Sequence, residues 1–229
     1  MPAKDIYIKE IIKDVIGTSR KGREKVIRLV QKKHPEIGSY RIRRVYERYG
    51  FALNRKLKRR IKNHPANPIE IPLSANREWA MDFMSDALAD GRRVRTLNVI
   101  DHYNRKCIGI KTLLNIPSRI VINELEKMIE KHGKPKGIRT DNGPEFRSKL
   151  FQTWMYKNDI EHIRIQKGKP QQNAIIERFN KTFREDVLDA NIFFSVSQLQ
   201  NSADKWIKEY NTERPHQSLN YLTPEEYAA

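Results

Sequence analysis

The sequence predicts an α/β fold, a mixed sheet flanked by helices, with a small all-α domain of helix-turn-helix type in front of it. Three observations support this: helical spacing of apolar residues over the first 50 positions, a proline-rich break at 63–78, and alternating strand and helix patterns from Trp79 onward. A chain of 229 residues with 38% hydrophobic content has room for one sizeable core and a small second domain.

Helices are expected throughout the amino-terminal part. The first carries apolar residues at helical spacing, namely Ile8, Ile11, Ile12, Val15 and Ile16. A second should span residues 20–33. A third should have Ser39 as its cap and stop at Gly50, and a fourth should follow Asn54. Short consecutive helices are typical of helix-turn-helix domains.

Positive charge is concentrated in the same part of the chain. Residues 1–64 hold 20 lysines and arginines against 6 aspartates and glutamates, a net of +14 out of +17 for the whole chain. Such a patch attracts a polyanion by counterion release, so double-stranded DNA is the expected partner. The fourth helix would supply the phosphate contacts Arg55, Lys58, Arg59 and Lys62. A basic helix that neutralises phosphates without reading bases fits equally well, and an anionic membrane surface fits less well.

The proline-rich stretch divides the chain. Pro65, Pro68 and Pro72 remove backbone donors and disfavour helix, which indicates a linker. The predicted organisation is a basic helical domain at 1–63, a linker at 64–78, an α/β core at 79–190, and a carboxyl-terminal helix and tail at 191–229.

Strand and helix patterns alternate after the linker. Three strands come first, at 79–84, 93–101 and 106–111, and the short turns between them favour an antiparallel meander. The remaining elements are expected to be a helix at 117–132 ended by Gly133, a strand at 137–140, a helix at 148–157, a strand at 160–166, a polar loop at 168–173 and a helix that carries Glu177.

Three acidic residues in different local settings point to chemistry. Asp82 lies on the first strand, Asp141 just past the fourth strand, and Glu177 on the last helix of the core. If the first and fourth strands pair side by side, both aspartates lie at one end of the sheet, where ligands commonly bind. Converging carboxylates suit Mg²⁺, and two such ions can activate an attacking oxygen and stabilise a leaving oxygen at phosphorus. The sequence therefore predicts a catalytic, metal-binding triad for phosphoryl transfer.

The helix of Glu177 is amphipathic. Steps of 100° place three polar residues within about 40° of Glu177, on a face that would meet phosphate: Asn173, Lys181 and Arg184. The opposite face carries the apolar residues Ile176, Phe179, Phe183 and Val187. Solvated charge pairs between neighbouring turns would explain this helix, but not the other two acids.

Composition disfavours several other classes of protein. The single cysteine, Cys107, cannot form an internal disulfide and is expected to be a small buried strand residue. The histidines show no zinc spacing. The amino terminus is charged and no apolar run is long enough to cross a bilayer, so we expect a cytoplasmic protein with no membrane partner.

Six separate blocks of sequence carry a family signature. They are 79–83 (WAMDF), 95–101 (RTLNVID), 141–146 (DNGPEF), 168–174 (GKPQQNA), 176–180 (IERFN) and 210–219 (YNTERPHQSL). Together they resemble bacterial insertion-sequence transposases of the copy-out-paste-in group, specifically the second reading-frame product called OrfB. The resemblance covers residues 74–229 and, more loosely, 20–62. The 35 residues between Asp141 and Glu177 also match the interval expected of transposases and retroviral integrases.

The resemblance implies an RNase H-like core in which Asp82, Asp141 and Glu177 bind two Mg²⁺ ions, with Mn²⁺ as a substitute. Lys181 and Arg184 would contact DNA near the scissile phosphate. The predicted nucleic-acid-binding set also includes Lys169, Asn173 and Arg178. In the family reaction, water attacks an element-end phosphodiester to release a 3′-OH, and that hydroxyl then attacks another phosphodiester, typically at the other end of the same element. The family further implies a homo-oligomer on transposon ends and target DNA, associated with the bacterial nucleoid.

This chain departs from the family pattern next to Asp101, and one property of the relatives bears on its partners. His102 stands where relatives often carry a second acid after Asp101, so this neighbourhood is expected to support the sheet, with Asp101 as a fallback acid only. Relatives are often fused to an upstream frame, OrfA, which is therefore a candidate partner.

Two alternatives stay open, a catalytically inactive DNA-binding regulator and an RNase H-type nuclease. Binding without cleavage would favour the first, and cleavage of RNA in a hybrid the second.

Overall fold

The computed structural model describes residues 3–17, 21–52, 71–166 and 170–228. The chain divides into two compact units, Met1–Pro65 with Pro215–Leu222, and Ala66–Arg214 with Thr223–Ala229. The four predicted domain boundaries stay a prediction. Among the described residues, we find no helix with the length and apolar character that a membrane span requires.

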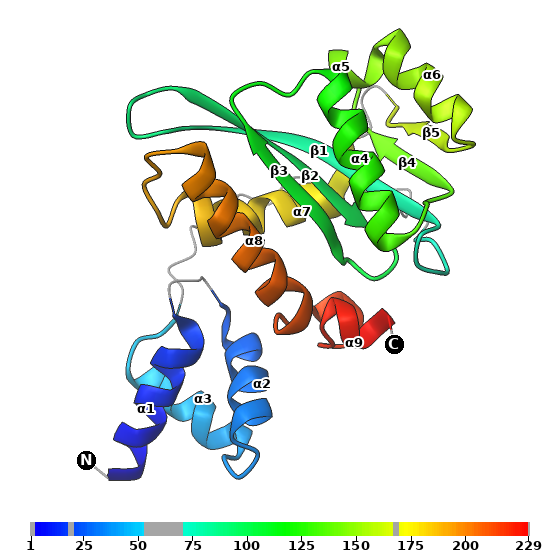
Figure 1. Cartoon of the computed structure of the whole chain (residues 1–229). Helices are drawn as coiled ribbons and strands as arrows, with labels where there is room; N and C mark the ends of the chain where they lie inside the picture. Colours follow the sequence, from blue (N-terminus) through cyan, green and yellow to red (C-terminus); the bar gives the residue numbers. More distant parts are fainter. Residues whose placement is uncertain (1–2, 18–20, 53–70, 167–169, 229) are drawn as a thin grey trace. The chain divides into compact units, whose positions relative to one another are not determined.

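In the described part of the amino-terminal unit, the α-helices α1 (Ala3–Ile16), α2 (Arg23–Lys33) and α3 (Ser39–Arg48) pack around their own apolar core (Figure 1). A buried carboxylate ties the first helix to the third, because Asp5 accepts hydrogen bonds from Arg44 at 2.7 Å and Arg48 at 3.3 Å. The expected cap of α3 is wrong by one residue. Gly38, with extended backbone, is the N-cap, and Ser39 is already helical. The predicted fourth helix lies outside the described residues.

The second unit is built on a five-stranded mixed sheet of order β3-β2-β1-β4-β5 (Figure 1). The strands are β1 (Glu78–Ala87), β2 (Arg93–Asp101), β3 (Cys107–Leu113), β4 (Gly137–Thr140) and β5 (Glu161–Arg164). The first three form the predicted antiparallel meander, whereas β4 pairs in parallel with β1, and β5 with β4. The predicted α/β fold class and the predicted burial of Cys107 on β3 are confirmed.

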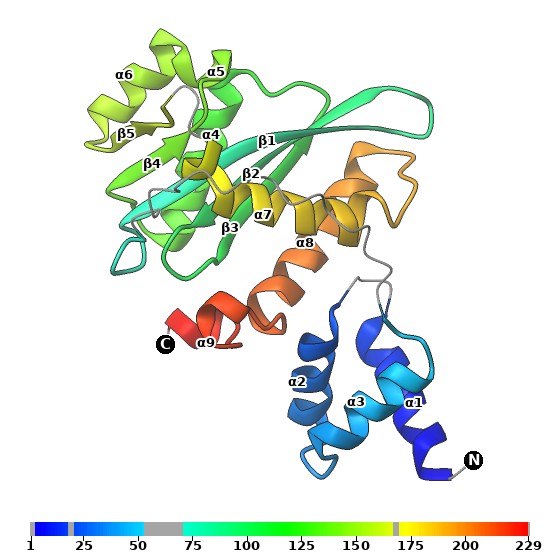
Figure 2. The same cartoon turned by 180° about the vertical axis from the view of Figure 1, so that it is seen from behind.

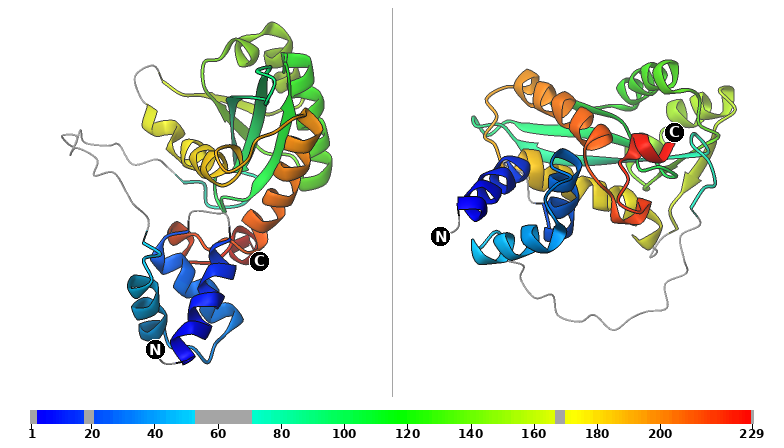
Figure 3. Two further views of the ribbon diagram at one scale, coloured as in Figure 1. Left: turned by 90° about the vertical axis from the view of Figure 1, so that its left-hand side faces the viewer. Right: turned by 90° about the horizontal axis from the view of Figure 1, so that it is seen from below.

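Helices cover both faces of this sheet (Figures 1, 2 and 3). One face carries α7 (Ala174–Phe183), which continues into the π-helix η2 (Arg184–Leu188), and α8 (Val196–Thr212). The other face carries α4 (Ser118–His132), α5 (Pro144–Arg147) and α6 (Lys149–Lys157). Side chains alternate along β1, so Ala80 and Met84 pack toward α7 while Trp79 and Met81 pack toward α4. The smaller elements are η1 (Pro170–Asn173), η3 (Gln217–Leu219) and α9 (Pro224–Ala228).

The π-helix η2 is a departure from the continuous α-helix expected around Glu177. Its Asp186 is buried, and its carboxylate accepts hydrogen bonds from Arg214 at 2.6 Å and from the Trp206 indole at 3.2 Å. The wider turn places an acidic residue inside, where a buried cation partners it. Apolar periodicity does not contain this signal, because partners for Asp186 lie 20 and 28 positions away.

Helix α8 covers the outer edge of the sheet through two side-chain amides. Gln200 accepts from the Thr112 N–H at 2.8 Å and donates to the Ile110 carbonyl at 2.9 Å. Asn211 does the same with both backbone groups of Cys107, at 2.8 and 2.9 Å. These amides replace a neighbouring strand, so the β3 edge does not present unpaired groups there for association with another chain.

A buried ionic cluster joins the start of β1 to β4. Glu78 accepts from Arg139 at 2.7 and 3.1 Å, and its carboxylate lies 2.6 Å from Nδ1 of the fully buried His102. Burial opposes the charge of Glu78, but the contacts with His102 and Arg139 prevail and lower its pKa to about 2. A carboxyl group with a lowered pKa stabilises the fold above its ordinary pKa, and that contribution is lost as pH falls toward the lowered value.

We therefore expect Glu78→Gln to reduce the free energy of unfolding by roughly 3 kcal/mol at pH 7, because it leaves Arg139 buried without its anion. The difference from wild type should vanish as pH falls from 4.5 toward 2. Urea unfolding followed by tryptophan fluorescence measures this in the second unit, since Trp79, Trp154 and Trp206 all belong to it. The exposed Glu161→Gln is the control. An equal loss at pH 7 and pH 3 would contradict the electrostatic explanation.

Candidate active site

The pairing of β1 with β4 brings the two predicted aspartates together. The strands are parallel, with Ala80 opposite Arg139. Continued by two residues, this register sets Asp82 opposite Asp141, which follows the last residue of β4. Helix α7, which carries the third acid, packs on the face of the sheet toward which Ala80 and Met84 point. It lies across β1 and β2 there (Figure 2). The two strands thus pair side by side, which is the condition under which both aspartates lie at one end of the sheet.

The three carboxylates differ in how firmly they are held. Asp82 Oδ1 accepts from the Phe83 N–H and Oδ2 from the Asn180 amide, both at 2.8 Å. Asp141 Oδ1 accepts from the Gly143 N–H at 2.8 Å. Glu177 is exposed and makes no hydrogen bond or ion pair within the described chain. The aspartates are thus fixed by the backbone and an amide, while the glutamate is free to move.

Electrostatics couples the three groups. Burial and, after it, the charges of Asp141 and Glu177 together raise the pKa of Asp82 to about 6, although the hydrogen bonds from Phe83 and Asn180 lower it. Burial is thus the main cause of the raised pKa, and the like charges come second.

The fit of this triad to a divalent cation rests on its donor chemistry. Carboxylate oxygens are the ligands that Mg²⁺ prefers, and each Asp82 oxygen accepts a single hydrogen bond, which leaves acceptor capacity unused. Within the residues that the structure describes, no three His, Cys, Asp or Glu side chains stand close enough to enclose an ion. The chemical type and the charge of these three residues therefore suit a divalent cation. Their carboxylates do not lie close enough together in this structure to enclose one.

The predicted DNA-contacting residues of α7 have different surroundings. Arg178 is exposed, and Lys181 is 58% exposed with Glu185 at 3.7 Å. Arg184 donates to the Ser85 carbonyl at 2.8 Å and pairs with Asp86, which holds it against the end of β1. These contacts stay a prediction.

Asn173 is buried, at 4% exposure, and its Oδ1 has no hydrogen-bond partner within the described chain. A contact with DNA would require this residue to move, and the contact stays a prediction. The remaining predicted contacts, Arg55, Lys58, Arg59, Lys62 and Lys169, lie outside the described residues.

Four polar residues at the site were not predicted from the sequence. Asn180 reaches Asp82 from α7, and it in turn accepts from Asn98 on β2 at 2.7 Å. Arg95 pairs with Glu145 and lies 4.2 Å from the Phe83 ring centroid. Asn180 lies three residues after Glu177, so the helical face could have indicated it. Asn98 lies opposite Asp82, which only the β1–β2 register reveals.

The Asp141 loop is held by its own contacts. The Glu145 carbonyl accepts from the Ser118 hydroxyl at 2.8 Å and the Ser148 hydroxyl at 2.9 Å. A Cβ added to Gly143 would lie 3.0 Å from Asp141 Oδ1, which is tighter than ordinary contact. Glycine at this position therefore lets the loop fold closely around the carboxylate.

The fallback acid serves the fold. Asp101 is buried and its carboxylate accepts from the backbone N–H groups of Asn76, Tyr103 and Asn104. Its neighbour His102 belongs to the Glu78 cluster. Both contacts agree with the expectation that this neighbourhood supports the sheet.

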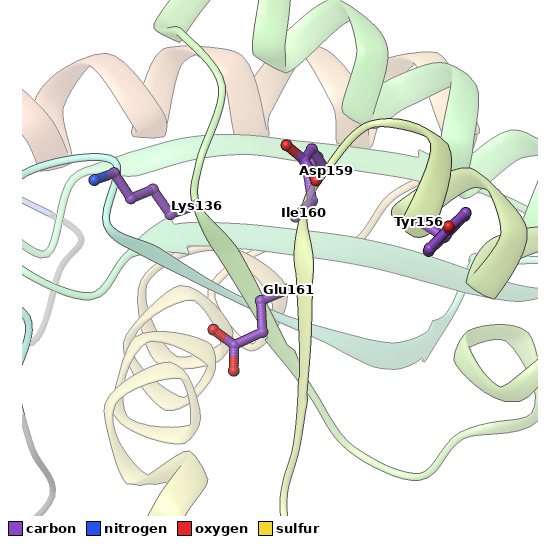
Figure 4. Close-up of a pocket in the computed structure, with 5 residues that line it drawn as sticks. All are labelled: Lys136, Tyr156, Asp159, Ile160 and Glu161. Atoms are coloured by element: carbon purple, nitrogen blue, oxygen red, sulfur yellow. The ribbon is translucent and has the colours of Figure 1, made fainter.

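A surface pocket lies elsewhere on the sheet (Figure 4). It is lined by Lys136, Tyr156, Asp159, Ile160 and Glu161. Lys136 precedes β4, whereas Asp141 follows it, so the pocket is at the opposite end of the strand from the aspartates. It is separate from the carboxylate site.

A mixed sheet of this order, with one aspartate on β1, one directly after β4 and a glutamate on the covering helix, is typical of integrase-type polynucleotidyl transferases with an RNase H-like fold. Two family profiles described as integrase core domain match the chain, over residues 72–170 and 158–224. An insertion element IS407 protein of Burkholderia multivorans is 36% identical over 92% of this chain and 76% of its own length. The chain belongs to the family of insertion-element transposases that carry an integrase core domain, and its activity class is DNA transposase or integrase of the DDE type.

Two further comparisons agree. The putative transposase InsK of insertion sequence IS150 from Escherichia coli K12 is 26% identical over 66% of this chain and 54% of its own length. The HTLV-2 integrase catalytic core domain, solved in complex with magnesium in a trimeric form, superposes with a TM-score of 0.55 at 21% identity, covering 69% of this chain and 99% of that one. The structural likeness confirms the predicted RNase H-like fold.

The coupling of the three acids can be measured. In the metal-free protein we expect the Asp82 carboxyl carbon to titrate near pH 6, and Glu177→Gln to lower that pKa because one like charge is removed. Carbon-detected NMR titration records both values, with Glu185→Gln in η2 as the control. A pKa of Asp82 that does not respond to Glu177→Gln would show that the two carboxylates do not interact.

Proposed function

We propose that this chain cleaves phosphodiesters at the ends of an insertion element and transfers the resulting 3′-OH to another strand, with Asp82, Asp141 and Glu177 as its catalytic residues. The observation that carries the proposal is the parallel β1–β4 register, which sets Asp82 opposite Asp141, together with the packing of the Glu177 helix α7 against β1. Such a sheet in a transposase family supports strand transfer over simple hydrolysis.

The same three carboxylates would hold two Mg²⁺ ions, for which Mn²⁺ can substitute. When bound, these ions supply Lewis-acid activation of the attacking oxygen and neutralise charge on the leaving oxygen. Asp82 contributes a carboxylate whose rotation is fixed by Phe83 and Asn180, and Asp141 one that is fixed by Gly143. Glu177 adds a side chain that can adjust, because no contact within the described chain restrains it.

DNA would approach along the exposed side of α7. Arg178 and Lys181 flank Glu177 there, and their charges would position phosphates without reading bases. Arg184 would act mainly by fixing the end of α7 against β1, and would reach DNA only after leaving Asp86.

The proposal includes an assembly on DNA in the bacterial cytoplasm, associated with the nucleoid. It consists of several copies of this chain on the element ends and the target, with an OrfA product as a further partner. The trimeric form of the HTLV-2 core supports oligomerisation as a property of the fold.

Glu177→Gln should abolish cleavage and strand joining while the fold and DNA binding persist, because Glu177 is exposed and the substitution removes only a charge. The loss should be at least ~100-fold, in line with removal of an essential acidic group. The measurement is Mg²⁺-dependent cleavage and joining on a duplex with the element's own ends. Full activity of the variant would remove Glu177 from the mechanism. Wild-type binding without any product would favour the regulator, and cleavage of RNA in a hybrid without joining would favour the nuclease.

Neutralising Arg55, Lys58, Arg59 and Lys62 to glutamine should weaken DNA binding and flatten its dependence on salt. The slope of log K against log salt should fall by about 0.9 for each phosphate that the variant no longer neutralises. Fluorescence anisotropy over a salt series measures this, with four lysines on α4 and α6 (Lys127, Lys131, Lys149 and Lys157) changed to glutamine as the charge-matched control. A slope equal to that of wild type would refute phosphate binding by residues 55–62.

A further inference from the structure

Two buried asparagines connect the catalytic strand to the Glu177 helix. Asn180 on α7 donates to Asp82 Oδ2 at 2.8 Å, and Asn98 on β2 donates to Asn180 Oδ1 at 2.7 Å. Their exposed fractions are 8% and 0%. Solvent therefore does not compete for these bonds, and the chain of two amides is part of the interior between sheet and helix.

The direction of this chain follows from its acceptor. An ionised carboxylate only accepts hydrogen bonds, so the NH₂ end of the Asn180 amide must face Asp82. Its oxygen then faces β2, where it needs a donor. Asn98 supplies that donor, which fixes the Asn180 amide in the orientation that the carboxylate requires.

Stability alone does not explain a polar residue at position 98. Asn98 Oδ1 is buried and has no hydrogen-bond partner within the described chain, which costs stability. Asn98 lies opposite Asp82 on β1 and Ile110 on β3, and Ile110 belongs to the apolar core on this face, against which an aliphatic side chain could pack. We therefore explain the asparagine at position 98 by its hydrogen bond to Asn180, whose amide it orients.

These hydrogen bonds leave part of the acceptor capacity of the two Asp82 carboxylate oxygens unused. Oδ1 is held by the Phe83 N–H and Oδ2 by Asn180, so the carboxylate cannot rotate, yet each oxygen keeps further lone pairs. Because Asn180 is three residues after Glu177, the same bond also sets the position of the Glu177 helix relative to Asp82.

We propose that Asn180 and Asn98 are positioning residues that fix the Asp82 carboxylate and the Glu177 helix for metal binding. This inference rests on the proposed function of the triad. Residues that orient a metal ligand typically change metal affinity or activity by 10–100-fold when removed. Asn180 acts on Asp82 directly, and Asn98 acts through Asn180.

The test is Mn²⁺ binding to the full chain without DNA, followed by the electron paramagnetic resonance signal of free Mn²⁺. Asn180→Ala should raise the dissociation constant about 10-fold or more. Asn98→Leu should raise it by a smaller factor while the melting temperature changes little, because the unpaired buried acceptor at Asn98 is exchanged for one at Asn180 and the added apolar side chain offsets the lost hydrogen bond. A residue with a purely structural role would not separate the two readouts in this way. Asn191→Ala, at an exposed asparagine bonded to the Val187 carbonyl, is the matched control.

The outcomes separate this inference from the proposed function. Asp82→Asn should lose Mn²⁺ binding. If it binds Mn²⁺ as wild type does, the triad is not the metal site and both proposals fail. If Asp82→Asn loses binding while Asn180→Ala and Asn98→Leu keep the wild-type dissociation constant, only the positioning role fails. Should Asn180→Ala not fold by circular dichroism, Asn98→Leu decides, since it removes the orienting donor without emptying the space.

Discussion

The parallel pairing of β1 with β4 is the constraint on which the site depends. It sets Asp82 opposite Asp141 and so brings like charges toward each other in a partly buried place. This arrangement is unfavourable on its own, because burial and, second, the like charges oppose the ionisation of Asp82 and raise its pKa. The sheet maintains it because apolar cores pack on both faces, and because the Glu78 and Arg139 pair joins the same two strands four residues before Asp82. Favourable charge pairing at one end of the strands thus offsets unfavourable pairing at the other.

A second requirement is that helix α7 keeps its place over the sheet. Its apolar side contributes Ile176, Phe179 and Phe183 to the core shared with β1 and α8. The π-helix that follows turns Asp186 inward to Arg214, which anchors the carboxyl end of this segment. Since the apolar side and the buried ion pair fix the helix, its exposed side is free to carry charges that serve the site. Helix α8 likewise contributes apolar side chains to the core, while its side-chain amides cover the β3 edge.

The sequence predicts well what depends on local pattern and poorly what depends on partners far along the chain. Strand alternation and helix periodicity indicated the meander and the helices, and glycine placement indicated the end of α4. Asn98 and Asn180 were not predicted, because each looks like an ordinary polar residue until the register and the helix packing are known. The π-helix and the pairing of Asn211 with β3 likewise follow from contacts across 20 to 104 positions.

The three carboxylates finally differ in freedom, and this difference has a chemical reason. Asp82 lies on β1 and Asp141 directly after β4, and backbone N–H groups and an amide determine their orientation. Glu177 sits on an exposed helix face with a longer side chain and no restraining contact in the described chain. In the proposed reaction the attacking group changes from water to a DNA 3′-OH, so the atoms around the scissile phosphate change between steps. A rigid pair of ligands preserves the geometry common to both steps, while an adjustable third ligand accommodates what differs. A helix-borne glutamate meets that need better than a third aspartate held by the sheet would.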